Sequence, residues 1–440
     1  MTTIGDADHD MLVQRELTAW PMNRRHFLRS AVGMLALAPA ARLHGQQPAV
    51  DEALPPIRQL TRLPGFHWFG YYDKLQFAPD DRLVLSNQVA FEHRSPKADD
   101  VIQVGMVDLE DGDRWHEFGT SRAWNWQQGC MLQWVPGTAA TIIWNDREDD
   151  HFVCHLLDVK SGKKRTLPRA LYALSPDGKW GISTDFRRLN DTRPGYGYTG
   201  VPDPYRKVPA PADSGLWRVN LETGAEQLIF TLEQAAAIPY SGNPNGFSKH
   251  AKHWFNHLLF SPDGSRFIFL HRWQGDGDKS FVTRLFTIAA DGTDPYILDP
   301  LGRTSHFVWR DPAHVFAWAF HPSHGDRFYL FKDKTAQVTV VGKDQMPTNG
   351  HNTYLPHTNN EWVLNDTYPD KQRLQHPYLY HAPTDRRVPL GHFPSPSAYV
   401  GEWRCDTHPR SSRSGKLVCI DSAHSGGRQL YLVDASQIVG

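Results

Sequence analysis

The sequence of 440 residues has few cysteines, almost no net charge and no long hydrophobic run beyond its N-terminus. Its 47 lysines and arginines balance 48 aspartates and glutamates, which excludes the basic surface expected of a nucleic-acid-binding protein. After residue 40 no stretch approaches the ~18 consecutive apolar residues of a transmembrane helix. The 4 cysteines are too few for a disulfide framework. Two interpretations stay open: Cys405 and Cys419 form a disulfide bridge, or the cysteines are buried free thiols.

Histidine and tryptophan, in contrast, are abundant, with 23 and 15 residues. Hydrophobic residues make up 40% of the chain and charged residues 22%, which is enough apolar material for a large folded core. Histidine titrates near neutral pH and is the commonest metal ligand in proteins. The positions of the histidines are therefore the first feature to explain.

The first forty residues have the pattern of an export signal. Residues 23–29 contain a twin-arginine pair, residues 31–38 are apolar, and residues 38–40 form a small-residue cleavage site. The apolar stretch has the length of a signal peptide and is too short to span a bilayer. We predict a twin-arginine signal over residues 1–40 and a periplasmic or secreted mature protein without a transmembrane segment.

A short turn motif recurs along the mature chain and defines a repeat. The motif is an aromatic or apolar residue, a variable residue and Pro-Asp-Gly or a variant of it, as in Phe260-Ser261-Pro262-Asp263-Gly264. Copies and degraded copies occur at residues 77–81, 134–137, 174–178, 260–264, 309–312, 354–356 and 408–410. Each copy precedes an apolar strand that ends in a polar turn, and the average spacing is about 55 residues.

Seven such repeats predict an all-β fold, a seven-bladed β-propeller formed as a single domain by residues 41–440. A pair of β-sandwiches does not explain seven regular turns. One short helix is expected at residues 232–238. The longest departure from the repeat, between residues 174 and 260, contains a loop rich in Pro, Gly and Tyr that includes Tyr196. We expect this loop to line a binding mouth.

Four histidines occupy equivalent positions in the last four repeats: His257, His306, His351 and His408. Each lies just before or at an inner-strand turn, and corresponding positions of successive blades converge on the central channel. Three imidazoles on one axis suit a divalent transition metal, and a fourth can act as a neutral base. A structural role, with one histidine per blade bonded to neighbouring backbone, is the alternative.

Further segments carry candidate site residues. Residues 70–74, Gly-Tyr-Tyr-Asp-Lys, offer Tyr72 as a proton donor or acceptor and Lys74 as a partner for a carboxylate, or else form an ordinary first strand. The two tryptophans of residues 124–129 suit either a sugar-binding platform or the core. Arginines that suit an acidic ligand or a surface salt bridge are Arg187, Arg310, Arg404 and Arg410.

Several of these segments resemble oligogalacturonate lyases. The similar residues are 71–81, 304–309, 350–351, 406–409 and 421–427. Members of that family are seven-bladed propellers that hold a divalent metal, typically manganese, on histidines and cleave uronate-containing oligosaccharides. Ulvan lyases, which are also seven-bladed propellers, are a neighbouring comparison without individual residue matches.

The resemblance implies roles for four residues. His306, His351 and His408 match metal-ligand positions, and the fourth ligand is left open. His257 matches the position of the histidine base. The implied cofactor is a divalent metal, Mn²⁺ first, with Ca²⁺ and Zn²⁺ as alternatives.

We therefore predict a monomeric polysaccharide lyase that cleaves uronate-containing glycans by metal-assisted β-elimination. Tyr72 is the expected acid for the leaving oxygen, although water is an alternative donor. An acidic oligosaccharide or polysaccharide is expected to bind to Lys74, Arg187, Tyr196, Arg310 and Arg410. The alternatives are a metal-dependent propeller hydrolase, either a glycosidase or a lactonase, and a non-catalytic sugar-binding propeller.

Overall fold

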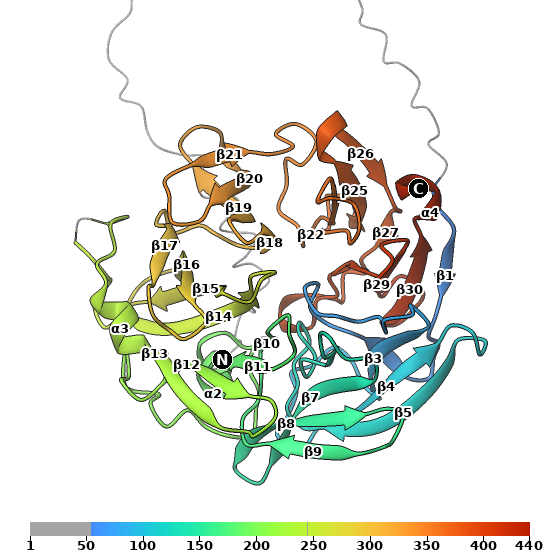
Figure 1. The fold of residues 1–440 in the computed structure, drawn as a ribbon, viewed down its shortest axis with the longest axis horizontal. Helices are drawn as coiled ribbons and strands as arrows, with labels where there is room; N and C mark the ends of the chain where they lie inside the picture. Colours follow the sequence, from blue (N-terminus) through green and yellow to red (C-terminus); the bar gives the residue numbers. More distant parts are fainter. Residues whose placement is uncertain (1–53, 244) are drawn as a thin grey trace, which may run out of the picture. The chain divides into compact units, whose positions relative to one another are not determined.

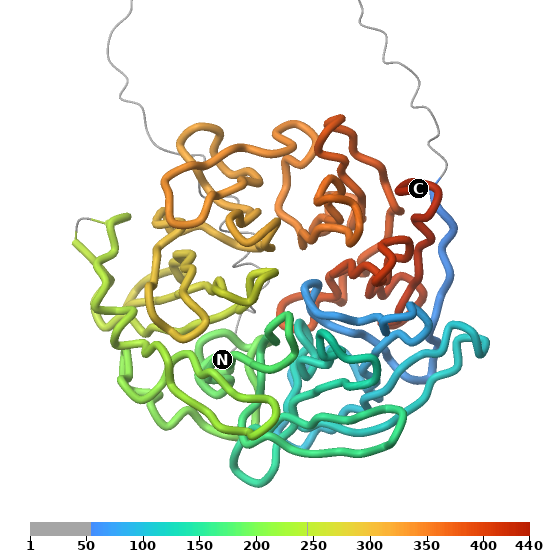
Figure 2. Tube along the Cα trace, in the orientation of Figure 1, coloured from blue at the N-terminus to red at the C-terminus, as the bar shows by residue number. Residues whose placement is uncertain are grey.

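Seven four-stranded antiparallel sheets surround a central axis in the part of the chain that the structure describes (Figure 1). The structure is a computed structural model that describes residues 54–243 and 245–440, so the predicted export signal lies outside the described residues. The chain visits the sheets in order, once around the ring (Figure 2). The predicted all-β, seven-bladed β-propeller is therefore confirmed.

In each of the first six sheets, or blades, the strand that comes first in the chain is the innermost. The first three blades, from the inside outward, are β2 (Phe66–Trp68), β3 (Leu83–Val89), β4 (Ile102–Asp108) and β5 (Arg114–Ser121); β6 (Gln133–Trp134), β7 (Thr141–Glu148), β8 (His151–Asp158) and β9 (Lys164–Leu167); and β10 (Ala173–Leu174), β11 (Trp180–Ser183), β12 (Gly215–Asn220) and β13 (Glu226–Thr231). The next three are β14 (Lys252–Phe260), β15 (Arg266–Gln274), β16 (Val282–Ala289) and β17 (Tyr296–Asp299); β18 (Phe307–Asp311), β19 (His314–His321), β20 (Gly325–Lys332) and β21 (Val338–Val340); and β22 (Thr353–Tyr354), β23 (Trp362–Asn365), β25 (Tyr378–His381) and β26 (Arg386–Pro389).

The seventh blade combines the two ends of the described chain. Its strands, from the inside outward, are β28 (Arg410–Ser411), β29 (Leu417–Ser422), β30 (Gln429–Asp434) and β1 (Ile57–Gln59). The first strand is thus the outermost strand of the last blade, where Ile57 pairs with Val433. This pairing closes the ring. A separate two-stranded ribbon consists of β24 (Leu374–Gln375) and β27 (Phe393–Pro394).

Helices are short. They are α2 (Phe186–Thr192), α3 (Leu232–Ala237) and α4 (Ser436–Val439), with 3₁₀ turns at η2 (Ala382–Thr384) and η3 (Gly401–Trp403). Helix α3 confirms the helix expected at residues 232–238, and Thr231 and Gln234 form a capping box at its start. None of the described helices has the length and hydropathy needed to cross a membrane.

The repeated Pro-Asp-Gly turns join the first and second strands of a blade. The turn at residues 176–178 connects β10 to β11, and the turn at residues 262–264 connects β14 to β15. Gly178 has a φ of +67°, and a Cβ atom there would lie 2.3 Å from the carbonyl oxygen of Pro136 in the preceding blade. Glycine is therefore required both by the turn and by the close packing of neighbouring blades.

The hydrophobic core lies between adjacent sheets. Side chains of β15 in the fourth blade, such as Ile268 and Leu270, pack with Phe307 of β18 in the fifth blade. Trp124 and Trp126 also belong to the core, with ring centroids 5.6 and 5.4 Å from that of Trp68. The core alternative for these tryptophans therefore holds, and the sugar-platform alternative is wrong. All four cysteines are buried free thiols, so Cys405 and Cys419 are not paired.

Candidate active site

The four histidines singled out by the repeat converge near the axis of the ring. His306, His351 and His408 precede the inner strands β18, β22 and β28, and His257 lies within the inner strand β14. Ring centroids are 4.3 Å apart for His306 and His351, and 4.2 Å apart for His351 and His408. All four side chains are buried. One residue from each of four successive blades thus contributes to a single cluster.

The first blade enters this cluster through a break in its inner strand. Trp68 pairs with Asn87 and Phe77 pairs with Val84, so residues 69–76 face only two residues of the next strand. These residues leave the strand as a loop, which we call the inner loop. It carries Tyr71, Tyr72, Asp73 and Lys74, and the ring of Tyr72 lies 5.4 to 6.4 Å from the rings of the four histidines.

Tyr72 ties the first blade to the fifth across the axis. Its hydroxyl donates to the carbonyl oxygen of Phe307 and accepts from the backbone N–H of Phe307, both at 3.1 Å. Burial raises the pKa of Tyr72 well above its ordinary value. Because both interactions of the hydroxyl are with the protein backbone, Tyr72 has a structural role in this geometry.

His257 is displaced from the regular strand by a β-bulge. Asn256 pairs with Leu270 and Leu259 pairs with Ile268, so His257 and its neighbour together face one residue of β15. The φ of His257 is +52°, in the left-handed region that non-glycine residues rarely occupy. Bulges and strained backbone of this kind re-aim side chains beside functional sites.

Asp73 holds one nitrogen of His257. Its Oδ2 lies 3.0 Å from Nε2 of His257 and its Oδ1 lies 2.9 Å from Nζ of Lys74, with all three side chains at most 3% exposed. Burial raises the pKa of Asp73, but the charge of Lys74 and the hydrogen bond with His257 outweigh it and lower the pKa to about 2. The carboxylate of Asp73 is therefore ionised and acts as the acceptor. Nε2 of His257 carries the hydrogen atom and donates the hydrogen bond to it.

The other nitrogen of His257, Nδ1, is buried and has no hydrogen-bond partner among residues 54–243 and 245–440. Burial lowers the pKa of His257 to about 4, despite the opposing effect of Asp73. The imidazole is thus neutral near pH 7, with its lone pair on Nδ1. An unpartnered buried nitrogen costs stability, so its retention fits a role in proton transfer.

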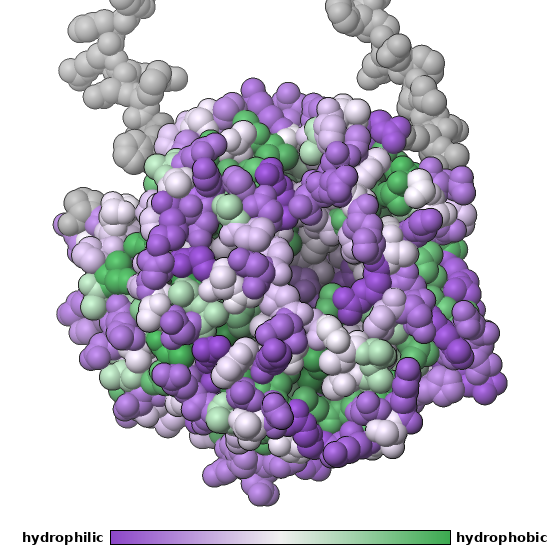
Figure 3. Space-filling view, viewed as in Figure 1, coloured by the Kyte–Doolittle hydropathy of each residue, from purple (hydrophilic) through white to green (hydrophobic). Residues whose placement is uncertain are grey.

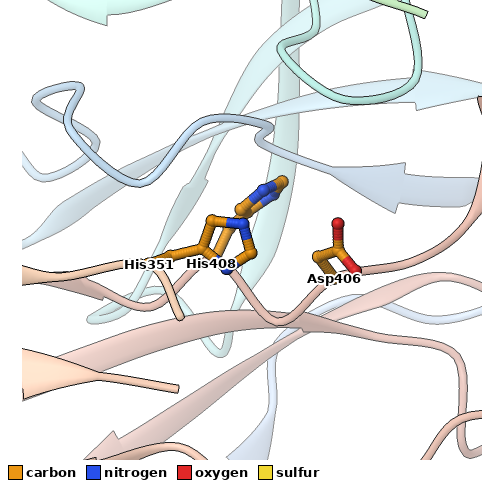
Figure 4. A group of neighbouring side chains, drawn as sticks. All are labelled: His351, Asp406 and His408. Atoms are coloured by element: carbon orange, nitrogen blue, oxygen red, sulfur yellow. The ribbon is translucent and has the colours of Figure 1, made fainter. Parts of the chain in front are cut away.

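His351, Asp406 and His408 form a candidate metal site. One ligand atom from each lies within 4.8 Å of the others, and Figure 4 shows the two imidazoles next to each other with Asp406 beside them. Nδ1 of His351 donates to both oxygens of Asp366, at 2.9 and 3.0 Å, which leaves Nε2 of His351 for a metal ion. Two imidazoles and a carboxylate in a buried site suit a divalent transition metal such as manganese.

His306, the third predicted ligand, lies beside His351 but outside this three-residue group. Its Nδ1 is 3.1 Å from Oδ1 of Asn349, so Nδ1 is the donor and Nε2 keeps its lone pair. Burial lowers the pKa of His306 and His408 well below the ordinary value. Both rings are therefore neutral, as metal ligands must be.

Tyr196 is the predicted substrate-binding residue that the structure brings to this cluster together with Lys74. It packs with Tyr71 and Tyr72, and its hydroxyl accepts from Nη2 of Arg404 at 2.7 Å. Nε of Arg404 in turn donates to Asp406 at 2.8 Å. The molecular face in Figure 3 is hollowed at its centre and bordered by many hydrophilic residues.

The side chains of three predicted substrate-binding arginines are held by groups other than the four imidazoles near the axis. Arg410 is buried and donates to Asp421 at 2.8 Å and to the carbonyl oxygen of His408, so it supports the turn that carries His408. Arg310 lies three residues beyond Phe307 along β18 and is bonded to the adjacent Asp311. Arg187 lies in the first turn of α2, where its guanidinium pairs with Asp185. The guanidinium of Arg410 is thus engaged within the protein, and its predicted contact with a glycan stays a prediction.

Sequence reasoning gave no role to Asp406, Asp366 or Arg272. Asp406 stands two residues before His408, so its motif carried a signal for a fourth ligand. Asp366 and Arg272 had no local signal, because they follow or lie in second strands outside the repeated motifs. Burial is the main cause of the lowered pKa of His257 and His306, and the positive charge of Arg272 adds to it.

No protein-family model and no curated protein matches the chain. Among solved structures, an oligogalacturonate lyase in complex with manganese is 15% identical over 88% of this chain and 94% of that chain, with a TM-score of 0.62. An oligogalacturonate lyase from Vibrio parahaemolyticus is 14% identical over 89% of this chain and 96% of that chain, also with a TM-score of 0.62. At this level of identity the comparisons confirm the resemblance in fold.

Proposed function

We propose that this protein is an exported polysaccharide lyase that cleaves uronate-containing glycans by β-elimination, with His257 as the base. A divalent cation, Mn²⁺ first, would be held by His351, Asp406 and His408, with His306 beside them. The observation that carries the proposal is the convergence of four histidines from four blades next to Asp406. The similar solved structures, named oligogalacturonate lyases and in one case a manganese complex, support it.

β-Elimination at a uronate removes the weakly acidic proton at C5 and breaks the bond between C4 and its oxygen. When bound, a divalent cation would supply positive charge that offsets the uronate carboxylate. Nδ1 of His257 takes the proton. The resulting imidazolium is stabilised by Asp73, which accepts a hydrogen bond from Nε2 of His257. Arg272 and Arg404 add positive charge around the cluster.

The direct test uses the purified protein supplied with Mn²⁺ and three uronate glycans, namely polygalacturonate, glucuronan and ulvan. β-Elimination leaves a double bond between C4 and C5 of the uronate, which absorbs in the ultraviolet, whereas hydrolysis leaves none. A rise in absorbance with any of the three supports the lyase. Its absence with all three would overturn it.

The base is tested by His257→Ala. We expect kcat to fall by about 10²–10⁴-fold, the usual contribution of a positioned general base, with metal content unchanged. The control is His324→Ala, an exposed histidine in the turn between β19 and β20. Loss of bound metal from His257→Ala would contradict the role of His257 as base.

A further inference from the structure

We propose that His376 and His392, which flank the two-stranded ribbon of β24 and β27, form a second metal site, one that takes Zn²⁺ or a similar transition-metal ion. Both side chains lie outside the axial cluster, which is the group of four histidines described above. The proposed lyase function makes no use of them. The proposal is therefore independent of that function.

The ribbon places the two histidines opposite each other. Strands β24 and β27 are antiparallel, and Gln375 is the partner of Phe393. The next residues along the two strands, His376 and His392, are therefore also opposite each other and point to the same side. Their Nδ1 atoms are 2.7 Å apart and their ring centroids 4.9 Å apart. The backbone thus brings two imidazole nitrogens to one point.

Asp370 fixes which nitrogen of His376 faces this point. Its Oδ2 accepts a hydrogen bond from Nε2 of His376 at 3.0 Å. Its Oδ1 accepts from the backbone N–H groups of Gln372 and Leu374, both at 2.9 Å, so the carboxylate is held in place by its own loop. Nε2 of His376 therefore carries the hydrogen atom, and Nδ1 presents its lone pair to His392. A ligating histidine usually donates its other N–H to a carboxylate in this way.

The same loop carries an equivalent pair at the axial cluster. It begins at Asp366, which accepts from Nδ1 of His351 and leaves Nε2 of that ring for a metal ion. At the ribbon the two nitrogens exchange roles, because Asp370 accepts from Nε2 of His376 and leaves Nδ1. One loop thus orients a histidine at each of two places.

The ribbon pair needs only a small adjustment to hold an ion. Two nitrogens bound to Zn²⁺ at about 2.0–2.1 Å in tetrahedral geometry lie roughly 3.3 Å apart. His392 is exposed and the side chain of His376 is 21% exposed, so rotation of the rings can widen the separation from 2.7 Å. When the ion is bound, the hydrogen atom of His392 is on Nε2, where water accepts from it.

The donor atoms select the kind of ion. Two imidazoles without a carboxylate ligand suit Zn²⁺, Cu²⁺ and Ni²⁺, whereas Mn²⁺ binds nitrogen donors most weakly among these ions. Water completes the coordination of the ion at the ribbon. The axial cluster, in contrast, adds the carboxylate of Asp406 to its imidazoles, and carboxylates suit Mn²⁺. The two sites therefore differ in the metal that they prefer.

The alternative is that the two histidines only bond to each other. A single hydrogen bond between exposed imidazoles contributes little to stability, because water competes for both rings. On this alternative the ribbon binds no zinc. Zinc binding to the ribbon therefore decides between the two.

Equilibrium dialysis of the full chain against Zn²⁺ counts the ions that each variant binds. His392→Ala should bind one zinc ion fewer than the wild type, and His376→Ala should show the same loss. The matched control is His116→Ala, which removes an exposed histidine from β5 and should bind as much zinc as the wild type. Equal zinc contents in His392→Ala and the control would overturn the proposal.

The same dialysis with Mn²⁺ separates the ribbon from the axial cluster. His392→Ala should bind as much Mn²⁺ as the wild type, because the ribbon pair lacks the oxygen donors that this ion prefers. A loss of Mn²⁺ from His392→Ala would show that the substitution disturbs the axial cluster, and would overturn the assignment of a separate site.

The role of Asp370 as a positioning residue is tested by Asp370→Asn. The zinc affinity of the ribbon should fall by about 10–100-fold, while the affinity of the axial cluster for Mn²⁺ stays at the wild-type value. An unchanged zinc affinity would show that Asp370 does not orient His376 for a metal ion.

Diffraction from crystals of the wild-type protein soaked in Zn²⁺ locates the ion directly. The anomalous signal at the zinc absorption edge should give a peak about 2.0–2.1 Å from Nδ1 of both His376 and His392. A peak at the axial cluster without one at the ribbon would overturn the proposal.

Discussion

The last four blades and the first blade supply the candidate site in different ways. Each of the last four contributes one histidine, from just before or within its inner strand, and these rings come together near the axis. The first blade contributes four consecutive residues, Tyr71 to Lys74, from an inner loop that interrupts its strand. Repetition brings like groups together, as a metal site needs. The interruption adds the hydroxyl, carboxylate and ammonium groups that a repeat cannot place side by side.

The largest expected effect on activity comes from the histidines of the last four blades. His351→Ala should lose the metal ion and lower lyase activity by roughly 10³-fold or more, since a bound cation supplies several kcal/mol of transition-state stabilisation. Metal analysis and initial rates measure both. Chelation of the wild type should reproduce the loss, and added Mn²⁺ should reverse it only in the wild type. A His351→Ala protein with full metal content would contradict the site.

The next effect concerns the inner loop. Asp73→Asn leaves the buried ammonium of Lys74 without its partner and should cost about 3–5 kcal/mol in the free energy of unfolding. The double variant Asp73→Asn/Lys74→Met removes both charges and should regain part of that loss. Urea unfolding of the three proteins measures it. Equal destabilisation in the single and double variants would show that the ion pair is not the cause.

A smaller effect is expected from Asp366, which lies in one of the histidine-bearing blades and only orients a metal ligand. Asp366→Asn should weaken metal affinity by about 10–100-fold, because Asp366 fixes the tautomer of His351. A competition titration with a metal-binding dye measures the affinity. The control is Asp370→Asn, an exposed carboxylate four residues further along the chain. An unchanged metal affinity in Asp366→Asn would contradict the assignment of His351 as a metal ligand.

The last prediction concerns stability and two buried histidines outside the axial cluster. Burial lowers the pKa of His67 on β2 and of His253 on β14 to about 4. Between pH 6.5 and 4 the unfolded chain takes up these protons and the folded chain does not, so stability is complete above pH 6.5 and declines as the pH falls. Each contributes at most about 1.4 kcal/mol per pH unit. Melting temperatures across this range should fall, and less steeply in His67→Gln.

The sequence predicted the ring of blades and the meeting of the histidines because both follow from the repeat. Pro-Asp-Gly turns fix where one strand ends and the next begins, and the recurrence of the motif in each blade places corresponding residues near the axis. The convergence of His257, His306, His351 and His408 was therefore accessible from their place in the repeat, whereas their individual roles came from the family resemblance. Helix α3 was accessible as well, from local pattern.

Contacts between distant segments were not accessible. Tyr71 and Tyr72 are chemically the same in the sequence, and only the position of Phe307, in another blade, shows that the hydroxyl of Tyr72 is held by backbone hydrogen bonds. Arg410 has the composition of a glycan ligand, yet Asp421 and the backbone of His408 occupy its guanidinium. Such distinctions depend on tertiary packing, which motif and spacing do not encode.

The pairing of β1 with β30 has a consequence for how the protein is made. Strand β1 is synthesised first among the strands, yet its partner is the last strand of the chain. Throughout synthesis β1 has no partner, and the edge of β30 is exposed until the two meet. The ring therefore cannot close before β30 has been synthesised, and removal of either β1 or β30 would leave the last blade without its outer pair.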